Sequence, residues 1–318
     1  MNRHWKKEEL ATLRRLRERF IARTAGKQDY WQKDEELALY DATFGERIGW
    51  KWDAVLRELT ALGWKPRSRK VLDWGCGSGV AGRRVLAQWP HLETLALHDR
   101  SARAVRFAAE RAPVPMGDRV VDGETLLVLS HVLSELPATE LAALLALARK
   151  AGEVLWVEAG THADSRRLIA EVREVLLPEF TAIAPCTHQA ACGLLTERNA
   201  PHWCHHFATV PAEIFQDGRW MEFGREMSID LRALPYSYLV LARGSAPLPA
   251  GCSRVIGRPR EAKGFAKILS CHAEGVGELV LQKRDAPELF RAFHKEAAGA
   301  VYRWDLEDGR ILKGERML

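Results

Sequence analysis

The stretch VLDWGCGSG at residues 71–79 decides the fold of this chain. An apolar run ends at Asp73, and three glycines at alternating positions follow it: Gly75, Gly77 and Gly79. A helical pattern over Val80–Trp89 comes next, so the order predicts a strand, a tight turn and a helix N-terminus. Glycines in such a turn let the backbone approach a ligand closely, and the helix end presents N–H groups and a partial positive charge.

A second acidic residue stands where a nucleotide-binding fold needs one. Asp99 follows the apolar run Leu92–His98 and lies about 20 residues after the glycines, where the acid that holds ribose hydroxyls is found. The spacing G-x-G-x-G resembles motif I of the class I S-adenosylmethionine-dependent methyltransferases. We therefore assign binding of S-adenosylmethionine to six residues: Asp73, Gly75, Gly77, Gly79, Asp99 and Ser130.

The rest of the chain predicts an α/β fold. Four short apolar runs have the length of strands: Lys70–Trp74, Thr94–His98, Leu126–Ser130 and Val154–Glu158. They alternate with four helical patterns: Val80–Trp89, Ala102–Arg111, Thr139–Lys150 and Ser165–Leu177. Strand–helix alternation indicates a Rossmann-like, mainly parallel sheet that is covered on both faces.

The pattern changes before and after this core. We expect an N-terminal helical region at 1–65, a methyltransferase-like core at 66–180, an irregular Cys- and His-rich insertion that binds metal at 181–235 and the last sheet strand at 236–244. The tail, 252–318, predicts a small basic β-rich module. Its strand-like runs, Ala266–Ser270, Glu278–Gln282 and Val301–Asp305, surround a helical pattern at Pro287–Ala297.

Composition and charge restrict the partners. The 318 residues, 47% of them apolar, suffice for a real core, and no run of about 18 apolar residues predicts a membrane span. The net charge of +5 is concentrated in residues 1–24 and in Arg254–Lys267, which indicates a polyanion such as RNA, the alternative being two solvated faces. We expect a monomer that is cytoplasmic in a bacterium or mitochondrial in a eukaryote.

Four of the six cysteines form an informative set. Cys186, Cys192 and Cys204 lie in the irregular insertion among several histidines, and Cys271 lies far downstream. Clustered Cys and His indicate a metal site, and four thiolates suit zinc or an iron–sulfur cluster. The spacing fits neither a common zinc finger nor the three-cysteine motif of radical S-adenosylmethionine enzymes, and buried cysteines with incidental histidines are the alternative.

Several segments in order resemble the bacterial and mitochondrial methyltransferase-like family that is linked to the small ribosomal subunit. They are RIGWKWDAVL at 47–56, motif I, SHVLSELP at 130–137, WVEAGT at 156–161, APCTH at 184–188, WCH at 203–205, YSYLVL at 236–241 and RPREAKG at 258–264. The resemblance implies a [4Fe–4S] cluster on Cys186, Cys192, Cys204 and Cys271, with zinc as the alternative, and the small ribosomal subunit and its rRNA as partner. Ala159 and Thr187 depart from the family, which usually has Pro at both places.

Methyl transfer itself has weaker support in the sequence. The position after the fourth predicted strand reads Ser130-His131-Val132-Leu133 instead of the Asn/Asp-Pro-Pro-Tyr of many amine methyltransferases. His131 and Glu135 are candidate general bases, and the alternative is a purely structural role for both. Three hypotheses follow: a ribosome-associated factor that binds S-adenosylmethionine, an active rRNA methyltransferase, and a small-molecule methyltransferase with structural zinc.

Overall fold

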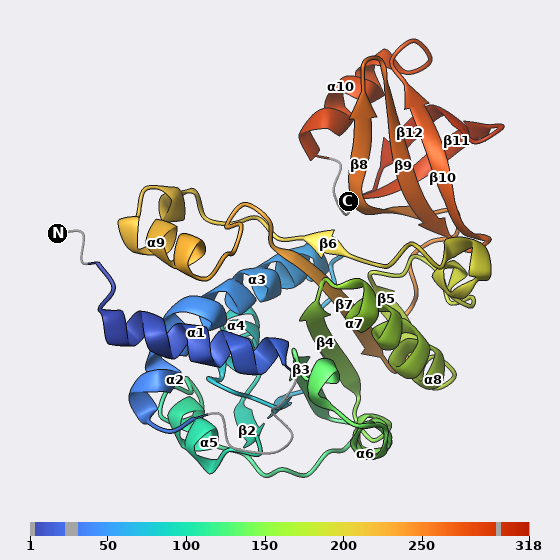
Figure 1. Cartoon of the computed structure of the whole chain (residues 1–318). Coiled ribbons are helices and arrows are strands. Elements are labelled where there is room, and N and C mark those ends of the chain that lie inside the picture. The colour runs from blue at the N-terminus through green and yellow to red at the C-terminus, as the bar shows by residue number, and fades with distance from the viewer. Residues whose placement is uncertain (1–3, 23–30, 297–299, 318) are drawn as a thin grey trace. The chain divides into compact units, whose positions relative to one another are not determined.

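The computed structural model describes residues 4–22, 31–296 and 300–317. It divides into two compact units (Figure 1). The first unit comprises Met1–Arg57, Lys65–Gly152 and Ala208–Leu234, and the second comprises Glu58–Trp64, Glu153–Phe207 and Pro235–Leu318. These units do not follow the predicted boundaries, because the expected insertion at 181–235 is divided between them at residue 208.

Helices open the first unit. They are α1 (Lys7–Ile21), α2 (Asp34–Tyr40), a π-helix η2 (Asp41–Gly45) and α3 (Glu46–Ala61), whose last residues belong to the second unit. Leu10, Leu13 and Leu16 repeat every three residues and form the buried face of α1. The predicted N-terminal helix is confirmed over α1, whereas Arg3 and Arg23 of its basic set lie outside the described residues.

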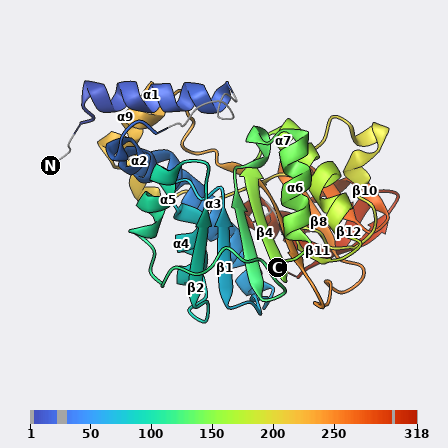
Figure 2. The same cartoon turned by 90° about the horizontal axis from the view of Figure 1, so that it is seen from below.

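Three parallel strands form the centre of the first unit. They are β1 (Lys70–Trp74), β2 (Thr94–His98) and β3 (Thr125–Ser130), with β1 between the other two. Helix α4 (Val80–Gln88) packs against β1 and β3, and α5 (Ala102–Ala109) packs against β2 (Figure 2). The unit also contains α6 (Ala138–Ala148), α9 (Gly218–Glu226) and the short 3-10 helices Leu133–Glu135 and Ala212–Phe215.

The second unit holds the other strands of the sheet. Strand β7 (Pro235–Ala242) runs antiparallel to β4 (Glu153–Ala159), β5 (Thr181–Ala184) and β6 (His206–Phe207). The helical segments are α7 (His162–Arg167), the π-helix η4 (Leu168–Arg173), α8 (Glu174–Leu176) and the 3-10 helices Gly193–Leu195 and Glu197–Asn199. Because β5, β6 and α9 all lie within residues 181–235, the prediction that this segment is irregular is wrong for these three elements.

The strand order identifies the α/β fold. The path is β2-β1-β3-β4-β7-β5, and Met116 adds a parallel bridge at the outer edge of β2 through Leu95. The first strands follow the doubly wound order of a Rossmann fold. The reversed β7 between β4 and β5 is the arrangement of the class I methyltransferase fold, so the predicted sheet is confirmed.

The tail folds into a closed barrel. Its strands are β8 (Ser253–Ala262), β9 (Phe265–His272), β10 (Gly275–Gln282), β11 (Val301–Glu307) and β12 (Arg310–Arg316), and α10 (Pro287–Glu296) lies between β10 and β11 in the sequence. The predicted β-rich module is therefore confirmed, although β8 and β12 were not predicted and Ala297 lies outside the described residues. In the described chain, no helix combines the length and the apolar character that a membrane span needs.

Candidate cofactor site and cysteine pocket

The glycine turn between β1 and α4 has a backbone that only glycine adopts easily. Gly75, Gly77 and Gly79 have φ values of 73°, 51° and 78°. A Cβ atom on Gly75 would lie 2.4 Å from Val132 Cγ1, whereas one on Gly77 would meet nothing within 4 Å. Gly75 is therefore needed for packing as well as for its backbone conformation, and open space lies next to Gly77.

Asp73 fixes the start of α4 by a hydrogen bond to its backbone. It is fully buried near the end of β1, and its Oδ2 accepts a hydrogen bond of 3.0 Å from the backbone N–H of Gly82. Its other oxygen, Oδ1, is buried and has no hydrogen-bond partner among the described residues. Burial and then the nearby charge of Asp99 raise the pKa of this carboxyl to about 7, against the hydrogen bond from Gly82, which lowers it.

Asp99 lies directly beside the glycine turn. Its Oδ2 accepts a hydrogen bond of 2.9 Å from Gly77 N, and its Oδ1 accepts one of 2.9 Å from Ser101 N. The backbone N–H groups of Gly75 and Cys76 both donate to His98 O, at 2.7 and 3.0 Å. The structure therefore brings Asp99 and the turn together as predicted, and a carboxylate has lone pairs for further donors.

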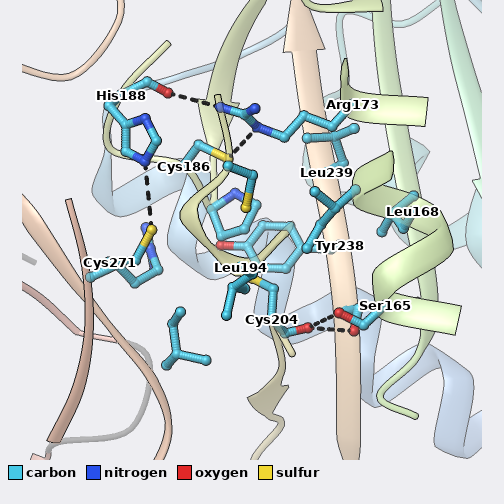
Figure 3. A pocket seen from close by; sticks show the side chains of 16 residues that line it. Ser165, Leu168, Arg173, Cys186, His188, Leu194, Cys204, Tyr238, Leu239 and Cys271 are labelled. Atoms are coloured by element: carbon cyan, nitrogen blue, oxygen red, sulfur yellow. Dashed lines mark hydrogen bonds between the residues drawn. The ribbon is translucent and has the colours of Figure 1, made fainter. Parts of the chain in front are cut away.

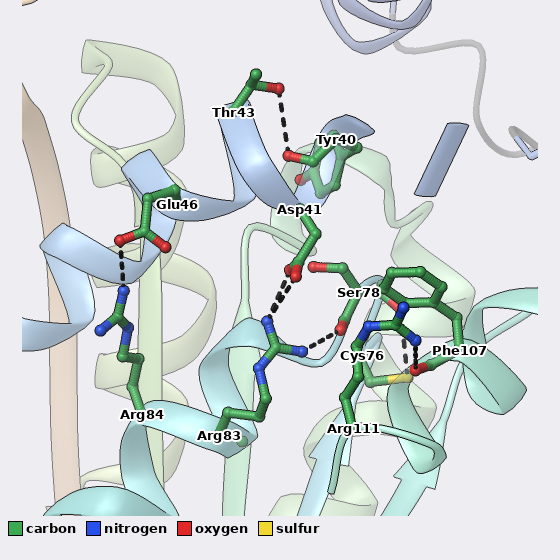
Figure 4. A network of polar contacts seen from close by, with 12 residues as sticks. Tyr40, Asp41, Thr43, Glu46, Cys76, Ser78, Arg83, Arg84, Phe107 and Arg111 are labelled. Atoms are coloured by element: carbon green, nitrogen blue, oxygen red, sulfur yellow. Dashed lines mark hydrogen bonds and ion pairs between the residues drawn. The ribbon is translucent and has the colours of Figure 1, made fainter. Parts of the chain in front are cut away.

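An ion pair that the sequence did not reveal closes the other side of the turn (Figure 4). Arg83 of α4 reaches both oxygens of Asp41 in the π-helix η2, at 2.7 and 2.9 Å, and donates to Ser78 O at 2.7 Å. Arg84, the next residue, pairs with Glu46 at 2.7 Å. The N-terminal helices are thus tied to the cofactor turn by paired charges.

The surroundings of the turn carry negative charge. The phenol of Tyr40 is buried, which raises its pKa, and the charges of Glu135, Asp41 and Asp99 raise it further. The charge that Asp99 exerts on Asp73 belongs to the same cluster of acids. S-adenosylmethionine carries a sulfonium and an ammonium group, so acids around an open glycine fit this cofactor chemically.

Ser130 and His131 follow β3 at its carboxyl end. Ser130 Oγ accepts a hydrogen bond of 2.9 Å from Trp52 Nε1, and His131 Nε2 lies 3.3 Å from Lys51 Nζ. His131 has a φ of 56°, a strained conformation for a residue with a side chain. Burial and then the charge of Lys51 hold the pKa of His131 well below its usual value, so its imidazole is neutral at pH 7.

The four predicted metal ligands line one cavity in the second unit (Figure 3). The ligands come from separate segments. Cys186 follows β5, Cys192 and Cys204 lie before and after the 3-10 helices, and Cys271 belongs to β9. Apolar side chains complete the lining, among them Leu168, Ile169 and Leu194. The structure thus brings together four residues that are up to 85 positions apart in the sequence (from 186 to 271).

Burial dominates the chemistry of these thiols. It raises the pKa of Cys192 to about 11 and also raises the pKa of Cys204 and of Cys271, on which neighbouring thiols act in the same direction. His188 Nε2 lies 3.6 Å from Cys271 Sγ, and His206 Nε2 lies 3.7 Å from Cys204 Sγ. Among the described residues, no group of three or more His, Cys, Asp or Glu side chains is arranged to hold a metal ion.

Two buried arginines also line the cavity. Arg173 donates from Nε to Cys186 Sγ at 3.1 Å and from Nη2 to Ala190 O at 2.8 Å, and it pairs with Glu174. Arg254 pairs with Glu58 at 2.6 Å, and only 2% of its side chain is exposed. Arg254 was counted in the basic segment that predicts an RNA contact, but its burial excludes that role for this residue.

The remaining cysteines take no part in this cavity. Cys252 is buried and does not line it, and Cys76 lies in the glycine turn. The residues that sequence reasoning missed are Asp41, Arg83, Lys51, Arg173 and Arg254. Asp41, Arg83 and Lys51 contact partners that are distant in the sequence, so no local pattern indicates them. The resemblance around residues 47–56 includes Lys51 but gives it no role.

The chain matches the model of one protein family over most of its length. Residues 45–303 match the model of the Rsm22 family, which is described as mitochondrial small ribosomal subunit Rsm22. The chain belongs to the Rsm22 family. The match covers both the glycine turn and all four cysteines of the cavity. No match was found among curated proteins.

Solved methyltransferase structures show distant likeness to this Rsm22-family chain. The magnesium protoporphyrin IX methyltransferase of Synechocystis PCC 6803 is 17% identical over 57% of this chain and 90% of that chain, with a TM-score of 0.32. The plantazolicin methyltransferase BamL is 12% identical over 74% and 100%, with a TM-score of 0.40. Because these TM-scores lie below 0.5, the assignment of the fold rests on the strand order and not on these likenesses.

The position of Asp99 generates a prediction about the cofactor. Replacing Asp99 by Ala should weaken binding of S-adenosylmethionine by roughly 1.5–3 kcal/mol, because a charged hydrogen bond is lost. Isothermal titration calorimetry of the purified chain measures this change. Asp118→Ala, at an exposed position, is the matched control and should bind as the parent does, and equal affinity for Asp99→Ala would remove Asp99 from the site.

Asp73 generates a prediction about pH. Its pKa is about 7 in the folded chain and about 4 in an unfolded one, so the folded state binds the proton more tightly. Its contribution to stability is complete below pH 4 and is lost as the pH rises to 7. Denaturant unfolding should show that Asp73→Asn lacks this loss, which amounts to roughly 4 kcal/mol. Parallel stability curves for parent and variant would contradict the raised pKa.

Proposed function

We propose that this chain is a factor of the small ribosomal subunit that binds S-adenosylmethionine and carries a [4Fe–4S] cluster. The match of residues 45–303 to the Rsm22 family is the observation that carries the proposal. The acids around an open glycine turn support the cofactor, and four cysteines in one cavity support the cluster. As a member of this family, the chain acts in mitochondria if it is eukaryotic and in the cytoplasm if it is bacterial, as a monomer.

The residues of the first unit have separate tasks toward S-adenosylmethionine. The open side of Gly77 would leave room for the amino-acid end of the cofactor, and Asp99, which accepts from Gly77 N, would accept further hydrogen bonds from the ribose hydroxyls. Asp73 holds the backbone of Gly82 and thereby the first turn of α4. Arg83 and Asp41 keep the N-terminal helices against the turn, so they position the site without contributing to its chemistry.

The cavity in the second unit fits an iron–sulfur cluster in its donor set. Cys186, Cys192, Cys204 and Cys271 would hold it, and four cysteine ligands leave no iron open to a substrate, so the cluster serves as a staple or a sensor. Arg173 already donates to Cys186 and, with Arg254, supplies buried positive charge toward four thiolates. Zinc is the alternative occupant, because four thiolates also suit a tetrahedral zinc ion.

Methyl transfer to rRNA is the second candidate function. Its support is the position of His131 at the carboxyl end of β3, beside Lys51. Burial and Lys51 lower the pKa of His131, which keeps the imidazole neutral at pH 7 but makes it a weak base. Glu135, four residues after His131, remains the other candidate base. Turnover of labelled S-adenosylmethionine on immature small subunits tests this function, and a loss of turnover in His131→Ala with unchanged cofactor binding would support it.

The cluster gives a prediction with a matched control. Chain purified without oxygen should be brown and contain iron and sulfide in the amounts that a four-iron cluster requires. Cys186→Ser and Cys271→Ser should lose the iron and unfold at a lower temperature, because bound metal stabilises the fold that binds it. Cys252→Ser should keep the iron, since Cys252 lies outside the cavity. A colourless parent with one equivalent of zinc would contradict the cluster.

Association with the ribosome gives a further prediction. The purified chain should sediment with isolated small ribosomal subunits and not with large subunits in a sucrose gradient, as expected for a member of this family. Raising the salt concentration should release it, because contacts to RNA phosphates weaken with salt. Equal sedimentation with both subunits, or with neither, would refute the proposed partner.

A further inference from the structure

The barrel at the C-terminal end has the topology of an OB-fold. Strands β8, β9 and β10 form an antiparallel meander, β10 pairs in parallel with β12, and β11 pairs with both β12 and β8 (Figure 1). Helix α10 lies between the third and the fourth strand of the barrel in the sequence. OB-folds bind oligonucleotides on the face of their second and third strands and in the loop between the first two.

The interior of this barrel leaves no room for a ligand. Apolar side chains fill it, including Ile268, Leu281, Phe293, Tyr302 and Ile311, each of which is at most 3% exposed. A ligand of the barrel must therefore bind to the outer face. In this chain that face consists of β9 and β10, together with the turn at Lys263 and Gly264 that joins β8 to β9.

An aromatic ring is exposed on this face. Phe265 begins β9, lies opposite Gln282 of β10 and Ala262 of β8, and is 36% exposed. Side chains alternate between the two faces of β9. Ala266 and Ile268 are buried and point into the barrel, so Phe265 and Lys267 share the outer face. Exposed aromatic rings on such strands are surfaces on which unpaired bases stack.

Three lysines lie near Phe265 in the sequence or the strand register. Lys263 lies in the turn, Lys267 lies two residues further along β9, and the backbone N–H of Lys283 donates to Gly264 O at 2.8 Å. Lys267 pairs with Glu278 at 2.7 Å, whereas no ion pair of Lys263 or Lys283 occurs within the described part of the chain. Cations beside an exposed ring match the phosphates that flank a stacked base.

The other basic residues of the segment already have partners, as Lys267 does. The guanidinium of Arg258 lies 4.1 Å from the centre of the Phe207 ring, Arg260 pairs with Glu278, and Arg254 is buried against Glu58. The charges available to a polyanion are therefore concentrated around Phe265 and not spread evenly over Arg254–Lys267.

We infer that the outer face around Phe265 binds single-stranded RNA, with one base stacked on Phe265 and the flanking phosphates held by Lys263 and Lys283. A duplex keeps its bases stacked on each other, so a stacking site selects unpaired RNA. The inference rests on the proposed association with the small subunit and specifies which kind of rRNA segment the barrel contacts.

The first test uses fluorescence anisotropy with the full chain, purified without oxygen. The probes are a labelled single-stranded RNA of about 12 nucleotides, within the range of site sizes of OB-folds, and a duplex of the same sequence. Phe265→Ala should weaken binding of the single strand about tenfold or more, as loss of one stacked base does, and Phe265→Tyr should retain it. Leu306→Ala, another exposed apolar position of the barrel, is the control and should bind as the parent does.

The second test addresses the lysines. Replacing Lys263 and Lys283 together by Ser should reduce the slope of the log–log salt dependence by roughly 1.4, since each phosphate contact to a single strand contributes about 0.7. Lys313→Ser, at an exposed position of β12, should leave the slope unchanged.

Two outcomes would overturn the inference. One is a Phe265→Ala variant that binds the single strand as the parent does, and the other is a parent that binds the duplex as tightly as the single strand. If Phe265→Ala binds the single strand normally while the parent still sediments with small subunits, this surface is refuted and the proposed function stands. If the parent does not sediment with small subunits, the proposed function fails, whatever the oligonucleotides show.

Discussion

The first unit depends on a buried carboxylate beneath a backbone turn that requires glycine. Asp73 holds Gly82 through its Oδ2, and this contact fixes where α4 begins relative to the end of β1. The positive φ values of Gly75, Gly77 and Gly79 then bring the chain around so that Gly77 N meets the carboxylate of Asp99. The site is therefore an arrangement of backbone that acids hold in place. The same acids give the surroundings of the turn the negative charge that a sulfonium cofactor needs.

The second unit has little regular structure in the loops around its cysteines. Cys186, Cys192 and Cys204 lie in or near short turns, and Cys271 is supplied by the barrel strand β9. Without metal, burial raises the pKa of three of these thiols, so they are protonated at neutral pH. Binding of metal would exchange those protons for a covalent link between the loops and the barrel. The arginines Arg173 and Arg254 lie where that exchange would place negative charge.

Much of the fold could be predicted from the sequence because its patterns are local. Strands β1 and β2 have the predicted bounds, since each is a short apolar run between a turn and a polar residue. Strand β8 has no alternating pattern to predict it, because its first half is buried on both faces and its second half, with Arg258, Arg260 and Glu261, is mostly exposed. The pairs Asp41–Arg83 and Lys51–His131 join residues that are 42 and 80 positions apart, and no local pattern reports such contacts. Arg254 resembled a solvated cation, and only its partner Glu58 explains its burial.

We propose that one chain holds both a cofactor and a cluster, each in its own unit. Native mass spectrometry of the chain, purified without oxygen and mixed with S-adenosylmethionine, tests this claim most directly. We expect the measured mass of the complex to equal the sum of the chain, one [4Fe–4S] cluster and one S-adenosylmethionine. A mass that corresponds to the chain alone, or to the chain with a single zinc ion and no S-adenosylmethionine, would contradict it.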